Sequence, residues 1–192
     1  MRVYLGMKVF LIFLLSALVA GTVAFSLGNS DSERNERGHI LDHPEVDPVR
    51  GWESMDRDLT PVRKTEEEWR EALSDEAFRI LRQDGTEQAF CSPLDEESRE
   101  GTYHCKGCDL PLFHSDHKFD SGTGWPSFYA PLHPDHLGDK LDRSFGMRRI
   151  EVHCARCEGH LGHVFKDGPA PSGLRYCING AAMHFRPLET DS

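Results

Sequence analysis

The six cysteines are the residues whose spacing points most directly to chemistry. Four of them form two Cys-x-x-Cys turns, Cys105 with Cys108 and Cys154 with Cys157. Two such turns can hold four thiolates around one zinc ion, each about 2.3 Å from the metal, and the closed tetrahedron leaves no position for water. We therefore expect one structural zinc ion. A disulfide framework and a redox-active pair of cysteines remain alternative interpretations of these residues.

The long separation between the two turns indicates what the metal would hold together. Residues 109–153 lie between them, which is more than a simple zinc ribbon contains. The site would therefore clamp two distant parts of a larger sheet domain. In the first turn, Gly107 is expected to supply the tight or left-handed backbone that such turns need.

The other two thiols, Cys91 and Cys177, are candidates for a different role. Cys177 lies in a run that is expected to form a strand, with Arg175 two residues before it and Asn179 two residues after it. Side chains two apart share one face of a strand. A cation there would lower the pKa of the thiol, and an amide could hold the thiolate or a substrate oxygen. On these residues alone, Cys177 could equally be a small core side chain.

The elements that must position these residues follow a simple order along the chain. Thr65 followed by Glu68 forms a capping-box pattern, which opens a helix whose apolar stripe continues to Leu73. Ser74 can cap a second helix, and Gly85 is placed to end it. Short β-like runs then follow around Tyr103 and at 125–129, 147–153, 161–165, 174–178 and 182–185. This order predicts a mainly β (α+β) domain with antiparallel sheets.

Residues 1–25 have the composition of an export signal. Arg2 and Lys8 precede an apolar run from Val9 to Phe25, and the small residues near Ala24 form a tolerable processing site. The run is just long enough to span a bilayer, so an uncleaved membrane anchor remains an alternative. In either case the rest of the chain is expected outside the cytoplasm, periplasmic, secreted or anchored at the membrane.

The remaining chain divides by composition. Residues 26–61 are polar and proline-spaced, which is typical of a linker or loosely ordered arm. The folded domain is expected at 62–187, with a short tail at 188–192. A net charge of −10 argues against nucleic acid as a partner, because nucleic acid binding needs basic patches. We expect a monomer.

Three segments together resemble the type-B methionine sulfoxide reductases, which act on the R epimer of methionine sulfoxide. They read FDSGTGWPSFY at 119–129, CEGHLGHVF at 157–165 and RYCIN at 175–179. The lead-in GTEQAF at 85–90 is similar to the N-terminal part of the same family. The resemblance covers roughly residues 60–187. It implies two antiparallel sheets with helices at the N-terminus and zinc at one end.

The resemblance also implies roles for individual residues. Cys177 matches the family nucleophile, which takes the sulfoxide oxygen and becomes a sulfenic acid. His163 matches a histidine that protonates that oxygen, as suits a side chain with an ordinary pKa near neutrality, and His160 matches its partner. Arg175 and Asn179 match residues that orient and polarise the groups around the nucleophile.

Trp125 matches the aromatic wall against which the substrate methyl group packs, and Phe165 is assigned to the same substrate-binding surface. Without the family, Trp125 would be interpreted as a core aromatic, and His160 and His163 as plain polar residues or metal ligands. Because His160 and His163 are three apart, an extended strand would place them on opposite faces. Both can line one site only if the backbone departs from a regular strand between them.

The chain departs from many members of this family at Thr123, where they carry a resolving cysteine. A hydroxyl cannot form a disulfide. Some relatives use a cysteine in the N-terminal region instead, and we expect Cys91 to resolve the sulfenic acid of Cys177. The alternative is that Cys91 is incidental and an external reductant attacks the sulfenic acid directly.

The expected function is therefore the thiol-dependent reduction of methionine-R-sulfoxide, free or in oxidised proteins. The resemblance implies a thioredoxin-like electron donor and no organic cofactor. The competing hypothesis is a zinc-stabilised binding domain on the same fold, without redox chemistry. Such a domain has no need for Cys177, His163, Asn179 and Arg175 together, and all four are present.

Overall fold

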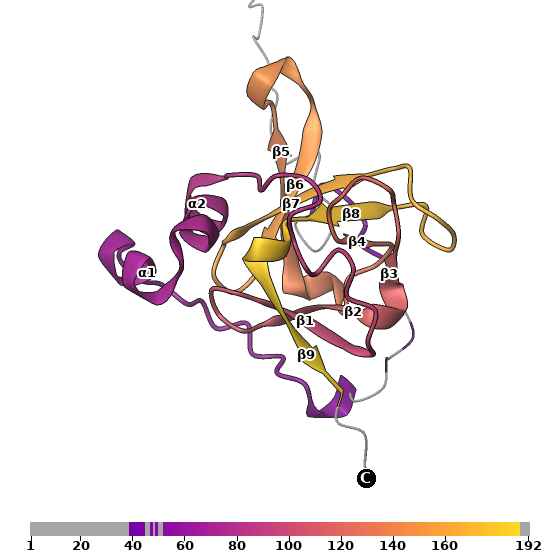
Figure 1. Cartoon of the computed structure of the whole chain (residues 1–192), viewed down its shortest axis with the longest axis horizontal. Coiled ribbons are helices and arrows are strands. Elements are labelled where there is room, and N and C mark those ends of the chain that lie inside the picture. Colours follow the sequence, from indigo (N-terminus) through magenta and orange to yellow (C-terminus); the bar gives the residue numbers. More distant parts are fainter. Residues whose placement is uncertain (1–38, 45–46, 48, 50–51, 189–192) are drawn as a thin grey trace, which may run out of the picture.

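The structure, a computed structural model, describes residues 39–44, 47, 49 and 52–188 (Figure 1). The expected export signal at residues 1–25 and most of the expected tail lie outside these residues. The helices are α1 (Glu66–Ala72) and α2 (Asp75–Gln83). The strands are β1 (Gly101–Cys105), β2 (Pro111–His114), β3 (Lys118–Phe119), β4 (Ser127–Phe128), β5 (Leu137–Asp142), β6 (Arg149–Cys154), β7 (His160–Phe165), β8 (Arg175–Ile178) and β9 (Met183–Pro187). Short 3-10 helices lie between them: η2 (Trp52–Ser54), η3 (Ser115–His117), η4 (Pro134–His136), η5 (Ser144–Gly146) and η6 (Gly180–Ala182).

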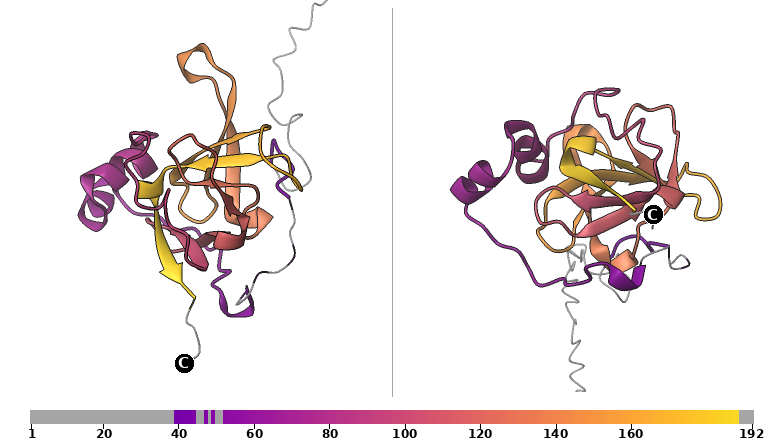
Figure 2. Two further views of the ribbon diagram at one scale, coloured as in Figure 1. Left: turned by 45° about the vertical axis from the view of Figure 1, so that its right-hand side comes forward. Right: turned by 60° about the horizontal axis from the view of Figure 1, so that its bottom comes forward.

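The strands form two antiparallel sheets, which confirms the predicted fold class. One sheet has three strands in the order β2-β1-β9, and the other has six in the order β3-β4-β8-β7-β6-β5. The helices α1 and α2 lie together at one side of the sheets (Figure 1), and α2 contacts β7 and η6. The β5–β6 hairpin projects from the rest of the domain (Figure 2).

Local sequence signals account for both helices. The Thr65 hydroxyl accepts a hydrogen bond from the Glu68 amide, and the Glu68 carboxylate accepts one from the Thr65 amide at 2.7 Å, so the predicted capping box is present. Ser74 caps α2 as predicted. The end of α2 differs by one residue from the prediction, because Asp84 and not Gly85 takes the left-handed conformation, with φ of 52°. Asp tolerates that region better than most side chains.

Strands β2, β3 and β5 were not predicted. β3 has two residues and carries no detectable period. β2 starts with proline, which weakens a strand signal. In β5, the sequence LGDKLD has buried Asp139 where an apolar side chain would be expected. Its partner in the ladder, β6, overlaps the β-like run predicted at 147–153.

An aromatic cluster fixes the orientation of β8. Tyr176 is fully buried and contacts Phe113, which stacks on Phe128 with ring centroids 4.3 Å apart. Each fully buried side chain of this kind contributes about 1.5–3 kcal/mol through burial of apolar surface. Because neighbouring residues of a strand face opposite sides, burial of Tyr176 and Ile178 turns Cys177 toward the other face of the sheet.

Part of the segment that was interpreted as a linker packs against the sheet. Leu41 and the side chains of His39 and His43 are buried, and the Ile40 and Leu41 amides donate hydrogen bonds to the Asp139 carboxylate. The composition of the segment gave no sign of this contact. The boundary between residues 61 and 62 stays a prediction. Within the described residues, no helix has the length and apolar character needed to cross a membrane.

Candidate active site and metal centre

Cys177 occupies the middle of the six-stranded sheet. It lies on β8 directly between its register partners, Ser127 on β4 and His163 on β7. Directly opposite residues of an antiparallel pair project to the same face, about 4.5–5.5 Å apart at Cβ. The sheet register therefore brings Cys177 and His163 together, although the two residues are separated in sequence by a long loop.

A β-bulge in β7 brings His160 and His163 together as well. Val152 pairs with Gly162 while His153 pairs with His160, so two residues of β6 face three of β7. The bulge breaks the strict alternation of the strand. As a result the two imidazole rings lie edge to face, with centroids 5.6 Å apart. His160 is buried, whereas His163 is half-buried.

A cavity of about 130 Å³ opens at Cys177 and His163. This is far smaller than the roughly 300–1,000 Å³ that drug-sized ligands occupy, and it suits the end of one side chain. Its walls combine apolar and polar groups, contributed by Thr86, Trp125, Arg149, Gly162, His163, Phe165, Cys177 and Asn179.

Asp142 holds His163 from outside the cavity wall. His163 Nε2 lies 2.8 Å from Asp142 Oδ2, and Arg149 donates to the same oxygen at 2.6 Å. Burial lowers the pKa of His163, and the Asp142 carboxylate opposes this shift. The contact occupies Nε2, so the other ring nitrogen, Nδ1, is the one that can serve the cavity.

His160 has a similar acidic partner. Its Nδ1 lies 3.0 Å from Glu151 Oε1, and Lys140 Nζ lies 2.9 Å from the same carboxylate oxygen. Burial alone would raise the pKa of Glu151, but His160 and Lys140 outweigh it and lower the pKa. The β5–β6 hairpin thus supplies one carboxylate to each histidine of β7, Asp142 to His163 and Glu151 to His160.

The thiol of Cys177 is half-buried, with polar groups beside it. Burial raises the pKa of Cys177, whereas the Arg175 guanidinium and the Thr123 hydroxyl lower it by charge and hydrogen bonding. Arg175 does not line the cavity. It forms two hydrogen bonds to Asp167, at 2.9 and 2.8 Å, and its guanidinium lies 4.6 Å from the centre of the Phe165 ring.

Asn179 is buried and both ends of its amide are engaged. Its Nδ2 donates to Leu161 O and its Oδ1 accepts from the Glu87 amide, each at 2.9 Å. The Glu87 carboxylate in turn accepts from the amides of Gly180 and Ala181. Trp125 Nε1 donates to Glu87 O at 3.3 Å. Asn179 therefore joins the bulge of β7 to the lead-in segment that carries Glu87 and supports Trp125.

Cys91 is exposed and lies on the same lead-in segment. The amide of the neighbouring Phe90 donates to Gly124 O at 2.8 Å, next to Thr123 in the loop that borders Cys177. Among the described residues all six cysteines are free thiols. The structure thus places Cys91 on a loop docked near the cavity, while Cys91 itself lines a separate surface groove.

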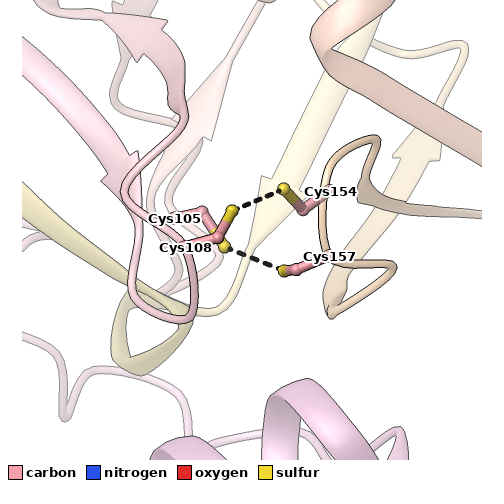
Figure 3. A group of neighbouring side chains, drawn as sticks. All are labelled: Cys105, Cys108, Cys154 and Cys157. Atoms are coloured by element: carbon pink, nitrogen blue, oxygen red, sulfur yellow. Dashed lines mark hydrogen bonds between the residues drawn. The ribbon is translucent and has the colours of Figure 1, made fainter. Parts of the chain in front are cut away.

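The other four cysteines converge from two turns, one between β1 and β2 and one between β6 and β7 (Figure 3). Cys105 Sγ lies 3.6 Å from Cys157 Sγ, and Cys108 Sγ lies 3.4 Å from Cys154 Sγ. All four sulfur atoms lie within 4.8 Å of one another. Thiolates about 2.3 Å from one tetrahedral ion would be roughly 3.8 Å apart, so this group fits a metal ion. It joins the three-stranded sheet to the six-stranded sheet.

The backbone of these turns corrects one expectation. The left-handed residues are Asp109 and Glu158, each directly after the second cysteine of its turn, with φ of 68° and 58°. Gly107 is not left-handed. A Cβ atom at Gly107 would lie 3.4 Å from Cys157 Sγ, which is an ordinary contact, so the space around this position does not require glycine.

Comparison with known proteins agrees with this geometry. The SelR domain profile matches residues 73–187. A peptide methionine sulfoxide reductase MsrB from Pseudomonas putida (strain W619) is 55% identical over 131 residues, which is 68% of this chain and 98% of that protein. The MsrB proteins of Agrobacterium fabrum and Leptospira interrogans are each 51% identical, over 133 and 125 residues, covering 68% and 65% of this chain and 98% and 95% of their own lengths. The chain belongs to the MsrB family.

Several residues around the MsrB site were not foreseen. Thr86 and Arg149 line the cavity, and Asp142 and Glu87 hold His163 and Asn179 in its wall. Glu151 holds His160, which does not line the cavity. Glu87 lies in the GTE segment that the family resemblance already singled out. Asp142 and Glu151 could have been found from the pairing of charged β5 and β6 residues, had β5 been recognised as a strand.

Proposed function

We propose that this chain reduces the R epimer of methionine sulfoxide, free or in proteins, with Cys177 as the nucleophile. The observation that supports this most directly is the cross-strand pair of Cys177 and His163, which face one small cavity beside Trp125. Reduction of a methyl sulfoxide requires a thiol, a histidine that is held by a carboxylate, and an apolar wall. The indole packs on the methyl group, and the histidine reaches the oxygen.

The reaction transfers one oxygen atom and two electrons. The Cys177 thiolate attacks the sulfoxide sulfur while protonated His163 gives its proton to the oxygen, which makes the sulfur a better electrophile. The oxygen ends on the Cys177 sulfur as a sulfenic acid, and methionine leaves. Cys177 is oxidised by two electrons and the sulfoxide is reduced by two. Arg175 and Thr123 support the thiolate before attack.

We assign Cys91 as the resolving thiol. Its attack on the Cys177 sulfenic acid would form a disulfide and release water, and a thioredoxin-like dithiol would then reduce the disulfide. The exposed position of Cys91 suits attack by such a donor, and Thr123 supports the assignment because it cannot take this role. Cys91 lines the surface groove and Cys177 the small cavity, so the disulfide is proposed to form after the lead-in segment moves.

This assignment predicts a specific disulfide. After one equivalent of methionine-R-sulfoxide, peptide mapping of the full chain should find Cys91 joined to Cys177. The Cys91→Ser variant should stop at the sulfenic acid. A wild-type map with sulfenic acid at Cys177 and a free Cys91 thiol would remove Cys91 from the cycle.

The metal of the four-cysteine group is proposed to be zinc with a structural role. Four thiolates suit zinc and leave no position for substrate or water. Bound there, zinc would supply cross-linking between the sheets and no catalysis. Cys105, Cys108, Cys154 and Cys157 would hold it, and no organic cofactor is proposed.

The site is proposed to work outside the cytoplasm, on oxidised exported proteins. The support is the apolar segment at 9–25 with its basic start. Mass spectrometry can identify the N-terminus of the chain isolated from its source. This distinguishes a cleaved export signal from an uncleaved membrane anchor. A start near residue 25 indicates a cleaved signal, and an intact apolar segment indicates an anchor. Recovery of the chain from the cytoplasm would contradict export.

Turnover tests the enzyme proposal against a binding domain without redox chemistry. With dithiothreitol as reductant, the wild-type chain should convert methionine-R-sulfoxide to methionine and leave the S epimer unchanged. Cys177→Ser should lose all conversion but keep its metal and its thermal transition. Absence of turnover in a folded, metal-loaded wild-type chain would contradict the proposal.

A further inference from the structure

A second group of metal-ligating side chains lies away from both sites described above. His39 and His43, from the segment before the domain, meet Asp139 of β5, and all three residues are buried. His39 Nδ1 lies 3.7 Å from Asp139 Oδ1, and His43 Nε2 lies 3.7 Å from Asp139 Oδ2. The ligand atoms all lie within 4.8 Å of one another.

His43 is held with one nitrogen toward this group. Its Nδ1 is 2.8 Å from the Tyr176 hydroxyl, and its Nε2 is buried without a hydrogen-bond partner among the described residues. The side chain of His43 has no exposed surface. Metal-bound histidines characteristically give their other ring nitrogen to a polar neighbour that fixes the ring and the tautomer. Tyr176 fills this position.

The group combines a buried carboxylate with imidazole nitrogens. The Asp139 carboxylate accepts hydrogen bonds from the Ile40 and Leu41 amides, at 2.9 and 2.8 Å, and His39 Nδ1 and His43 Nε2 each lie 3.7 Å from it. A buried carboxylate is costly unless hydrogen bonds or a cation compensate its charge. A metal ion bound between these atoms would supply a cation and would also give His43 Nε2 a partner.

The two other clusters of possible ligands already contain a cation. Lys140 Nζ lies 2.9 Å from Glu151 in the cluster of Asp84, Glu151 and His160. Arg186 lies 2.5 Å from Asp109 in the cluster of His104, Asp109 and His184. Among the residues that the structure describes, no lysine or arginine forms an ion pair with Asp139. Within the described part of the chain, the group at Asp139 thus differs from the other two in having no paired lysine or arginine.

We propose that His39, His43 and Asp139 bind a divalent first-row transition-metal ion, with Zn²⁺ as the best-suited occupant. Two imidazole nitrogens and one carboxylate oxygen suit such an ion, whereas Mg²⁺ and Ca²⁺ prefer oxygen ligands alone. Ligands about 2.0–2.1 Å from tetrahedral zinc lie roughly 3.4 Å apart, and the three ligand atoms lie within 4.8 Å of one another, so binding would draw the group together. Three protein ligands leave a fourth position for water.

The metal would fasten the N-terminal segment to the back of the catalytic sheet. Tyr176 follows Arg175 and precedes Cys177 on β8, so the second metal would lie on the face opposite the nucleophile. This anchor is independent of the four-cysteine group and of sulfoxide reduction. Its failure in a test would leave the proposed enzyme activity untouched.

The test measures metal stoichiometry on the full chain in detergent. After loading with zinc and removal of loose metal, the wild type should hold two zinc ions per chain and the His43→Gln variant one. His133→Gln is the matched control, because His133 is a half-buried histidine that belongs to none of the ligand clusters, and it should keep two. One zinc per chain in the wild type, or two in His43→Gln, would overturn the proposal.

Cobalt distinguishes the two sites even if a variant folds poorly. Thiolate ligands give cobalt intense charge-transfer bands, whereas nitrogen and oxygen ligands give only weak visible bands. With the cysteine group filled by zinc, wild-type chain should bind one further Co²⁺ without charge-transfer bands, and His43→Gln should bind none. When His43→Gln is loaded with cobalt alone, loss of the thiolate charge-transfer bands would show that the variant is misfolded. The proposal would then be judged by whether the wild-type chain binds the further Co²⁺.

Discussion

Reaction at Cys177 places opposite protonation demands on two neighbouring residues. Attack needs the Cys177 thiolate and, at the same moment, protonated His163. Burial raises the pKa of Cys177 and lowers the pKa of His163, so each demand is met poorly near neutrality. Between the two pKa values, a rise in pH increases the fraction of Cys177 thiolate by the same factor by which it decreases the fraction of protonated His163. The reactive fraction is therefore small but constant across that range.

This balance predicts the pH profile and the effect of Asp142→Asn. For methionine-R-sulfoxide, kcat/KM should be flat between the two pKa values and fall on both sides. Asp142 raises the pKa of His163, so its removal lowers that pKa, moves the acid limb to lower pH and lowers the plateau. Each unit of pKa lost costs about tenfold in rate, equivalent to about 1.4 kcal/mol.

Asp135→Asn is the matched control for this prediction. Asp135 is exposed and pairs with His133 outside the cavity, and its substitution should leave the profile unchanged. An acid limb that stays in place in Asp142→Asn would show that Asp142 does not act through His163.

At the scale of elements, the bulge in β7 sets the site. A regular strand would separate His160 from His163, but the extra residue opposite β6 brings both rings to one side. The close approach of β7 to β8 depends on Gly162. A Cβ atom there would lie 2.1 Å from Cys177 O and 3.1 Å from Ile178 Cα, both backbone atoms of the adjacent strand.

Gly162→Ala should therefore force β7 away from β8 between His163 and Cys177. We expect a stability loss of about 1–3 kcal/mol and a larger loss of kcat than of metal content, measured by denaturant unfolding and turnover. Gly146→Ala is the control, since a Cβ atom at this hairpin tip meets no neighbour and costs only left-handed backbone strain. Full activity in Gly162→Ala would show that the strand spacing is not critical.

The limits of prediction from sequence also belong to this scale. The helix caps, most strands and the four cysteines of the Cys-x-x-Cys turns followed from local patterns, because caps and such turns are encoded within a few residues. The roles of Asp142 and Glu151 were not predicted, because they depend on the pairing of β5 with β6. The bulge could not be predicted either, because strand register depends on how two strands pair and not on the sequence of one strand.

At the scale of the molecule, the four-cysteine group joins the two sheets. The three-stranded sheet contributes Cys105 and Cys108, and the six-stranded sheet contributes Cys154 and Cys157 (Figure 3). The sequence spacing predicted a clamp between distant parts, and the structure has this arrangement. The packing of His39 and His43 against Asp139 had no sequence signal, because polar residues in a proline-spaced segment indicate solvent exposure when read alone.

Removing the metal should therefore unfold much of the domain. Structural zinc sites contribute about 10–16 kcal/mol of apparent binding free energy, comparable with the total stability of a domain. Treatment with a strong chelator under reducing conditions should abolish the cooperative thermal transition, and added zinc should restore it. An unchanged transition after confirmed removal of all metal would contradict a structural role.

The central claim is that Cys177 takes the oxygen of the sulfoxide, and a labelled oxygen atom tests it directly. The Cys91→Ser variant is given one equivalent of methionine-R-sulfoxide that carries heavy oxygen, and the protein is trapped with a sulfenic acid reagent that retains the oxygen. The account predicts the label on the peptide that contains Cys177, with one methionine formed per label and none from the S epimer. Methionine formed without label on Cys177, or label on another cysteine, would contradict it.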